Sequence, residues 1–443
     1  MQSLTTTNPA NPAIKFLEDF KETALYIQNN PYRDIRQKAI KHFEELGFPT
    51  TKNEEWKYTN IIPHVSKQFQ FAKKEFVLKA IDDLNIALTL NDAIVVVLEN
   101  GFLNPVLSDL NNLPAGLTIK SIAECENDVV FSKHFANHAE QGIDAFSALN
   151  TAFMNDGVYL HVAKNVIIEK PIYIINVTAQ GEEDMITFPR CLIFSEKGSK
   201  AAVEWLTTTK TRRGSTSLMA AVNEIVVEEN ARLDFCILQN DHEQVAQVCN
   251  TYAYQEANSH FNINTITIGG NLVRNKLHIK LDGLNVETHL FGLAMGGGSQ
   301  LIDNHTAVTH AKPHCFSNQL YKGIMDGASL GVFNGKIMVM KDAQKTNAFQ
   351  SNKNILLSDD AAMYAKPQLE IFADDVKCSH GATTGQIDEE ALFYLRTRGI
   401  GIDRAKSLLN VAFAADVIRN IPNEALRNYI LDLIENKLTV HNN

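Results

Sequence analysis

The residues of this 443-residue chain best suited to chemistry are a cysteine and a histidine two positions apart, Cys378 and His380 in Val376-Lys-Cys-Ser-His-Gly381. If this segment is a β-strand, its side chains alternate, so the thiol and the imidazole project from one face and Ser379 from the other. Such a pair suits a soft or borderline metal, and it could also form a nucleophile–base pair. The third interpretation is a packed cysteine beside a surface histidine.

The metal interpretation requires further ligands. An iron–sulfur cluster usually needs about four protein ligands. Cys378 and His380 would supply half of such a set. The remainder would then come from elsewhere, such as a partner chain.

Other histidines gather earlier in the chain. They and one following cysteine are His278, His289, His305, His310, His314 and Cys315. Their spacing matches no closed zinc motif. They could form a metal site, or they could be hydrogen-bonded residues on a polar face of the fold.

The sequence contains no phosphate-binding loop of the form Gly-x-x-x-x-Gly-Lys-Ser/Thr. Gly296-Gly-Gly-Ser299 is rich in glycine but lacks the lysine and a following helix, which favours a tight turn. We therefore expect this chain to bind no ATP.

The hydrophobic pattern predicts helices at both ends of the chain. Apolar residues recur at helical spacing over residues 14–27 and 33–46. A polar segment at residues 53–59 follows, in which Trp56 and Tyr58 are expected to pin the segment to the body of the protein. Asp388 is a plausible N-cap for a helix beyond which two more helices are expected.

Between these ends, short runs of β-branched residues separated by Gly, Asn and Asp predict strands from about residue 157 to 375. A loose repeat, a turn residue followed by Ala or Ser, begins at Gly198, Asn230, Asn258, Gly298, Gly327 and Asp360. A recurrence of about 30 residues suggests the stacked coils of a β-solenoid, although a β-sandwich also has regular turns.

Composition excludes several classes of protein. The 41 basic and 51 acidic residues give a formal net charge of −10, which argues against a general nucleic-acid binder. No apolar run approaches the ~20 residues of a membrane helix. Six scattered cysteines without a secretory signal indicate reduced thiols and a cytoplasmic location.

Several segments resemble the SufB/SufD family of iron–sulfur cluster assembly scaffolds. They are residues 366–388, 392–400, 53–59, Lys345-Thr-Asn347 and Asn354-Ile-Leu-Leu-Ser358. The run Cys-Ser-His-Gly-Ala-Thr-Thr-Gly from Cys378 is closer to the SufD branch than to the SufB branch, whose members typically read His-Glu-Ala-Thr there. The similarity covers both ends and most of the predicted β body.

The resemblance implies a right-handed parallel β-helix flanked by α-helical regions. The expected divisions are an N-terminal helical region (1–90), a mixed α/β connection (91–156), the β-helix (157–387) and a C-terminal helical region that docks an ATPase (388–443). It also implies a non-catalytic scaffold that pairs with a SufB-like paralogue and binds a SufC-like ABC ATPase through its C-terminal helices. The chain alone could form a homodimer.

On this resemblance, His380 matches the family's interface histidine, and Cys378 is a second candidate ligand of a transient iron–sulfur cluster or iron at the subunit interface. Three alternatives stay open. They are a SufB-like main scaffold, a β-helix carbohydrate-active enzyme, and a structural partner in which Cys378 and His380 only pack.

Overall fold

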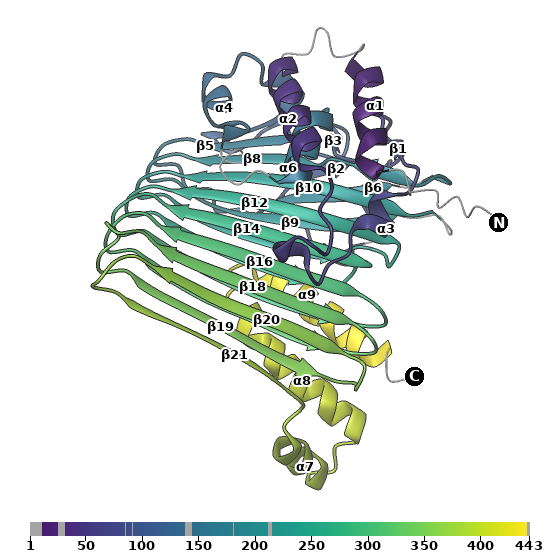
Figure 1. Ribbon diagram of the computed structural model, residues 1–443, viewed down its shortest axis with the longest axis vertical. Coiled ribbons are helices and arrows are strands. Elements are labelled where there is room, and N and C mark those ends of the chain that lie inside the picture. The colour runs from purple at the N-terminus through teal and green to yellow at the C-terminus, as the bar shows by residue number, and fades with distance from the viewer. Residues whose placement is uncertain are drawn as a thin grey trace, which may run out of the picture.

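The computed structural model describes residues 11–24, 32–84, 86–90, 92–137, 144–179, 181–210 and 215–440. Its centre is a parallel β-helix, in which successive strands alternate between two facing sheets (Figure 1). Helices precede and follow the coils. The predicted fold class, a β-solenoid between helical regions, is confirmed. None of the helices in the described part of the chain has the length and apolar character needed to span a bilayer.

Along each sheet, most neighbouring strands are two apart in the chain order and run parallel. Sheet A runs in the order β20-β18-β16-β14-β12-β10-β8-β5-β4, and sheet B in the order β21-β19-β17-β15-β13-β11-β9-β6-β2-β3. The strands of sheet A are β4 (Leu117–Ser121), β5 (Val158–Val162), β8 (Arg190–Ser195), β10 (Ser217–Val227), β12 (Val245–Gln255), β14 (Leu272–Leu281), β16 (Leu301–His310), β18 (Leu330–Val339) and β20 (Ala362–Ile371), with β1 (Gln70–Phe71) and β7 (Met185–Thr187) beside them. Those of sheet B are β2 (Ile94–Glu99), β3 (Phe102–Leu103), β6 (Ile172–Ala179), β9 (Lys200–Lys210), β11 (Arg232–Asn240), β13 (His260–Thr267), β15 (Glu287–Gly296), β17 (Phe316–Met325), β19 (Asn347–Leu356) and β21 (Lys377–Gly385).

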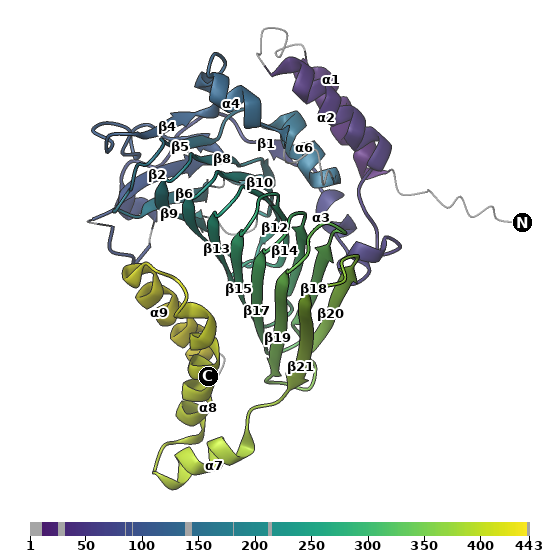
Figure 2. The ribbon, with the colours of Figure 1, turned by 90° about the vertical axis from the view of Figure 1, so that its left-hand side faces the viewer.

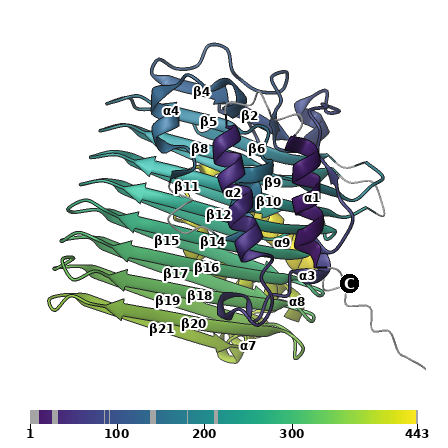
Figure 3. The same cartoon turned by 45° about the horizontal axis from the view of Figure 1, so that its top comes forward.

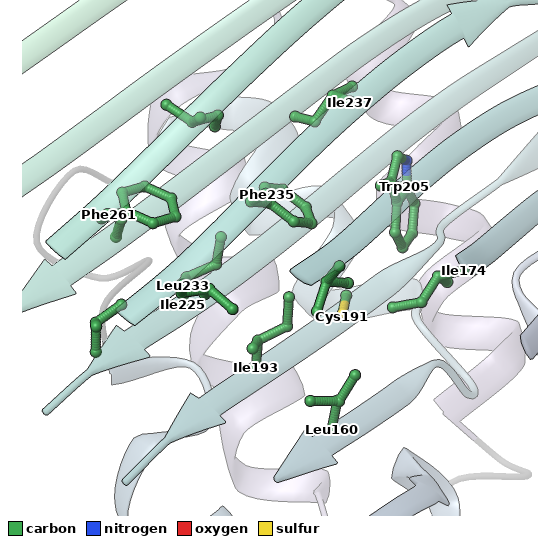
Figure 4. Close-up of a cluster of buried hydrophobic side chains, with 14 of the residues drawn as sticks. Leu160, Ile174, Cys191, Ile193, Trp205, Ile225, Leu233, Phe235, Ile237 and Phe261 are labelled. Atoms are coloured by element: carbon green, nitrogen blue, oxygen red, sulfur yellow. The ribbon is translucent and has the colours of Figure 1, made fainter. Parts of the chain in front are cut away.

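The space between the sheets is filled by every second residue of each strand. Figure 4 shows Trp205, Phe235 and Phe261 lying on neighbouring strands of sheet B and facing Ile193 and Ile225 of sheet A. All five side chains are buried. A single coil could not cover this apolar surface, but stacked coils share it, and its burial is the main source of stability.

The corners of the coils explain the sequence repeat. Gly198, Asn230 and Asn258 have positive φ at the corner that leads from sheet A to sheet B, whereas Gly298 and Gly327 have positive φ at the opposite corner. The repeat therefore combines two series of turns. Its one long interval, from Asn258 to Gly298, is a change of corner and not a longer coil.

The N-terminal region covers the outer face of the early coils of sheet A. Its helices are α1 (Pro12–Ala24), α2 (Arg33–Leu46), α3 (Ile62–Val65), α4 (Val129–His134) and α6 (Ala145–Phe153), with short 3-10 turns η1 (Glu54–Trp56), η2 (Ile81–Leu84) and η3 (Ile122–Glu124). Figure 3 shows α1 and α2 side by side over these strands. Helix α6 packs against α2 and against β10, so it lies between α2 and the sheet (Figure 2). The predicted helix at 33–46 is confirmed; the predicted first helix ends at Ala24 in the structure, and residues 25–27 lie outside the described part.

The C-terminal helices cover sheet B instead. They are α7 (Glu389–Thr397), α8 (Ile402–Ile418) and α9 (Glu424–Val440), and Figure 2 shows α8 and α9 along the face opposite the N-terminal helices. Val417, Ile418 and Ile430 pack on Leu238 and Leu293 of the sheet. Asp388 caps α7 as predicted, accepting hydrogen bonds from the backbone N–H groups two and three residues on.

Candidate functional site

Strand β21 ends the coil stack on the side away from the N-terminal helices (Figure 1). Among the described residues it pairs with β19 alone, and most of its own residues are exposed. Lys377 N–H donates to Thr346 O, directly before β19 (2.9 Å). The opposite edge of β21 carries backbone groups that no strand of the described residues covers. Such an edge is a template for pairing with another chain.

Both predicted site residues lie on β21. The register places Cys378 beside Ala348 and His380 beside Gln350, and both neighbours are buried inside the coil. Cys378 and His380 therefore share the inner face, as strand alternation predicted. His380 is nevertheless exposed, because no further coil lies beneath it. Its imidazole makes no hydrogen bond with another described residue.

Cys378 is less accessible than His380. It is half-buried and borders a small apolar cluster that includes Ile337, Val339 and Ala348. Burial raises the pKa of the Cys378 thiol above its ordinary value, and a backbone hydrogen bond at Ala348 offsets this in part. Since the thiolate is the metal ligand, Cys378 needs a metal or a partner to favour its deprotonation. No hydrogen bond joins it to His380, so the geometry does not support a nucleophile–base pair.

The five earlier histidines do not form one site. His278 and His305 lie on the outer face of sheet A, His289 on the outer face of sheet B, His310 inside the coil and His314 in a corner. Three of them have their own partners, since His289 Nε2 lies 2.8 Å from Glu287, His305 Nε2 lies 2.9 Å from Asp303, and His310 Nε2 lies 2.8 Å from Ser317. Across the described ranges, no group of three or more His, Cys, Asp or Glu side chains is placed to hold a metal ion.

Large apolar side chains are exposed on the last coils, a feature that the sequence interpretation missed. They are Met340, Phe349, Tyr364, Ile371 and Phe372. For Phe349 and Tyr364 the sequence does hold a signal, an apolar residue at a position that strand alternation turns outward. Together with the uncovered edge of β21, these side chains mark the end of the stack as a surface suited to protein contact.

The segment at residues 53–59 ties the N-terminal region to strands β14, β16 and β20 of sheet A. The Arg274 guanidinium lies 3.9 Å from the Trp56 ring centre, and Thr59 Oγ1 donates to the buried Asp303 (2.5 Å). The rings of Tyr58 and Tyr364 stack with centres 4.2 Å apart. The prediction that Trp56 and Tyr58 pin this segment is confirmed.

Two lysines fix the C-terminal helices to sheet B. Lys322 Nζ, on β17, donates to Phe413 O (2.8 Å) and to Asp416 Oδ2 (2.7 Å) of α8. Lys437 Nζ, on α9, donates to Met295 O (2.8 Å) and Gln300 Oε1 (2.7 Å) as well as to the Ile268 carbonyl. Burial lowers the pKa of Lys437 to about 8. These bonds hold α8 and α9 in place.

Helix α7 is different, because it packs mainly against α8 and extends beyond the coil stack (Figure 2). Its Phe393 and Tyr394 side chains are 70% and 57% exposed. Tyr394 Oη accepts a hydrogen bond from Arg398 Nη2 (3.1 Å), whereas both rings leave apolar surface available for contact with another molecule.

Comparison with known protein families gives two matches that together span most of the chain. Residues 176–413 match the model described as "SUF system FeS cluster assembly, SufBD core domain". Residues 11–174 match that of the SufBD protein N-terminal region.

Curated proteins of similar sequence carry names from the same family. The chain is 30% identical over 425 residues to an iron–sulfur cluster assembly SufBD family protein of Synechocystis, with 93% of each chain covered. It is 30% identical over 412 residues to the iron–sulfur cluster assembly protein SufD of Escherichia coli, covering 90% of this chain and 92% of that one. It is 25% identical over 421 residues to SufD of Bacillus subtilis, covering 92% and 94%.

Proposed function

The chain belongs to the SufBD family of SUF-system iron–sulfur cluster assembly proteins, and on that premise we propose that it is a SufD-type scaffold subunit without catalytic activity of its own. The observation that carries the proposal is the exposed His380 on a terminal strand with one uncovered edge, with Cys378 on the same face. This is an incomplete ligand set at a surface suited to a partner. The cargo would be a transient iron–sulfur cluster or iron.

The partner in this proposal is a SufB-like paralogue that covers the open end of the coil stack. The uncovered edge of β21 offers backbone hydrogen bonds, and the exposed apolar residues of the last coils offer contact area. In the absence of the paralogue, a second copy of this chain could use the same surface. A site completed by two chains is labile, which suits a scaffold that must release its product.

Two features favour the SufD role over the SufB role. The sequence at the site, from Cys378 to Gly385, fits the SufD branch. The SufD proteins of Escherichia coli and Bacillus subtilis align with at least 90% of the chain. Because the chain belongs to the SufBD family, we set aside the alternative of a β-helix carbohydrate-active enzyme.

In this proposal, a SufC-like ABC ATPase binds at the C-terminal helices and drives their movement. We assign α7 as the contact element because its aromatic side chains are exposed. Assembly would take place in the cytoplasm. All six cysteines are unpaired in the structure, in agreement with a reducing compartment.

The test is His380→Ala in the reconstituted complex of this chain, a SufB-like chain and the ATPase. We expect cluster formation to be lost while the complex still assembles, measured by the visible absorbance of the cluster and by size-exclusion chromatography. His260→Ala is the matched control, since His260 lies on the outer face of sheet B and is paired with Glu287. Normal cluster yield with His380→Ala would remove this histidine from the mechanism.

A further inference from the structure

A chain of hydrogen-bonded side chains runs inside the coil toward the site. Gln319 of β17 donates its Nε2 hydrogen to Thr306 Oγ1 across the interior (2.5 Å). Gln350 of β19 donates its Nε2 hydrogen to Gln319 Oε1 in the coil above (2.8 Å). The next position in this column, by the register of β19 and β21, is His380. The column of amides therefore ends at the candidate ligand.

The oxygen of Gln350 has no partner. The Gln350 side chain is only 4% exposed, and its Oε1 atom is buried without a hydrogen bond. An unsatisfied buried acceptor costs about 1–3 kcal/mol, so a donor that reaches this oxygen from the open end would be favoured. Because the amide nitrogen is committed to the coil above, the oxygen is left for a group in the coil below.

The opposite wall of the coil makes room for this amide. A Cβ atom at Gly335 of β18 would stand 2.2 Å from Gln350 Nε2. Glycine at this position therefore allows the Gln350 side chain to extend across the interior. Any larger residue at position 335 would displace the amide from its place above His380.

We propose that Gln350 is the positioning residue of His380. Its Oε1 accepts a hydrogen bond from one ring nitrogen of His380 when a partner covers the open end. A neutral imidazole has one N–H donor and one lone pair, so this bond fixes the tautomer and directs the lone pair of the other nitrogen toward the metal cargo. The inference rests on the proposed function of His380.

The experiment uses the reconstituted complex with ¹⁵N-histidine in this chain only. The ¹⁵N signals of His380 are assigned with His380→Ala, and cluster yield is measured alongside. Gln350→Leu removes the acceptor, whereas Gln350→Glu keeps an acceptor oxygen. Asn352→Leu is the matched control, because Asn352 is another buried amide of β19 whose register neighbour is Ala382.

We expect Gln350→Leu to lower cluster yield about 10-fold and to convert the His380 ring from one tautomer to a mixture. Gln350→Glu should restore most of the yield, and Asn352→Leu should change neither quantity. If Gln350→Leu fails to fold, Gly335→Ala displaces the same amide and should give the same change in tautomer.

The outcomes separate this inference from the proposed function. Wild-type yield and tautomer in Gln350→Leu, with His380→Ala inactive, would overturn the positioning role alone. An equal loss of cluster yield in Gln350→Leu, Gln350→Glu and Asn352→Leu would also overturn it, because that result would indicate a general packing effect. Normal yield with His380→Ala would instead overturn the proposed function.

Discussion

The identity and common face of Cys378 and His380 could be predicted from the sequence, but their different accessibility could not. Strand alternation depends only on local spacing, and the register with Ala348 and Gln350 confirms it. Exposure depends on whether another coil follows. The same inward-facing position is buried in β19 and open to solvent in β21.

The environment of Glu204 could not be predicted from the local sequence pattern. It lies on β9 beneath the connection between α8 and α9, where Asn423 Nδ2 approaches Glu204 Oε1 (3.4 Å) and donates to Tyr173 Oη (2.6 Å). Burial raises the pKa of Glu204 to about 8, with a smaller contribution in the same direction from Asp234. The side chain is therefore mostly neutral at pH 7.

This shift predicts a pH-dependent gain in stability for Glu204→Gln. Between its ordinary pKa of 4.5 and about 8, folded Glu204 keeps a proton that the unfolded chain releases. The free energy of unfolding therefore falls as pH rises through that window. The variant escapes this loss, so its advantage should grow by at most about 1.4 kcal/mol per pH unit and level off above pH 8.

Urea denaturation of wild type and variant at pH 5, 7 and 8.5 measures this advantage. Glu229→Gln is the control, because Lys197 hydrogen-bonds the exposed Glu229 carboxylate and holds its pKa below the ordinary value. That variant should gain nothing at high pH. A Glu204→Gln advantage that is the same at pH 5 and 8.5 would contradict neutral Glu204.

At the scale of elements, the sequence repeat predicted the coils correctly, but it did not distinguish the turns at one corner of the coil from those at the other corner. Asn258 is followed on its own corner by Asn285, which also has positive φ, but Val286 follows it where the repeat expects Ala or Ser. His314 and Lys345 continue the series at the same corner, and both have positive φ, although neither is Gly or Asn. Asn and His adopt positive φ more readily than most residues, so Lys345 is the position at which tertiary stacking must impose this conformation.

The C-terminal helices also differ in role more than their sequences suggest. Helices α8 and α9 bury apolar residues against sheet B, including Val417 and Ile434, so they form part of the core. Removing residues 388–443 would expose that surface and disturb the whole fold. The binding of the ATPase is therefore better tested on α7.

Replacing Phe393 and Tyr394 together by Ala should abolish retention of the ATPase without lowering the thermal midpoint of the chain. Both rings are largely exposed, so their loss removes little buried area from the isolated chain. Pull-down with the purified ATPase and a thermal melt check the two statements. Leu392→Ala is the contrasting variant, since Leu392 is buried and its loss should lower the thermal midpoint. Undiminished ATPase retention by the double variant would show that docking lies elsewhere.

At the scale of the whole molecule, the C-terminal helices cover sheet B, and the N-terminal region covers the outer face of the early coils of sheet A (Figures 2 and 3). The end formed by β20 and β21 is left open. In a parallel sheet, the backbone N–H and C=O of one residue point to the strand on one side, and those of the next residue point to the strand on the other side. Because Lys377 N–H bonds to β19, residues 379, 381 and 383 do so as well, and His380 and Ala382 direct their N–H groups to the free edge.

This alternation gives a precise way to test docking by strand addition. Ala382→Pro removes an N–H group that bonds to no described strand, so the isolated chain should keep its thermal midpoint within a few degrees. The same change should strongly weaken association with a SufB-like partner, measured by size-exclusion chromatography and calorimetry. Thr383→Pro is the contrast, because it removes a bond to β19 and should lower the thermal midpoint of the isolated chain. If Ala382→Pro associates with the partner as tightly as wild type, the partner does not pair with this edge, and the completion of the His380 site by a strand from a second chain would have to be abandoned.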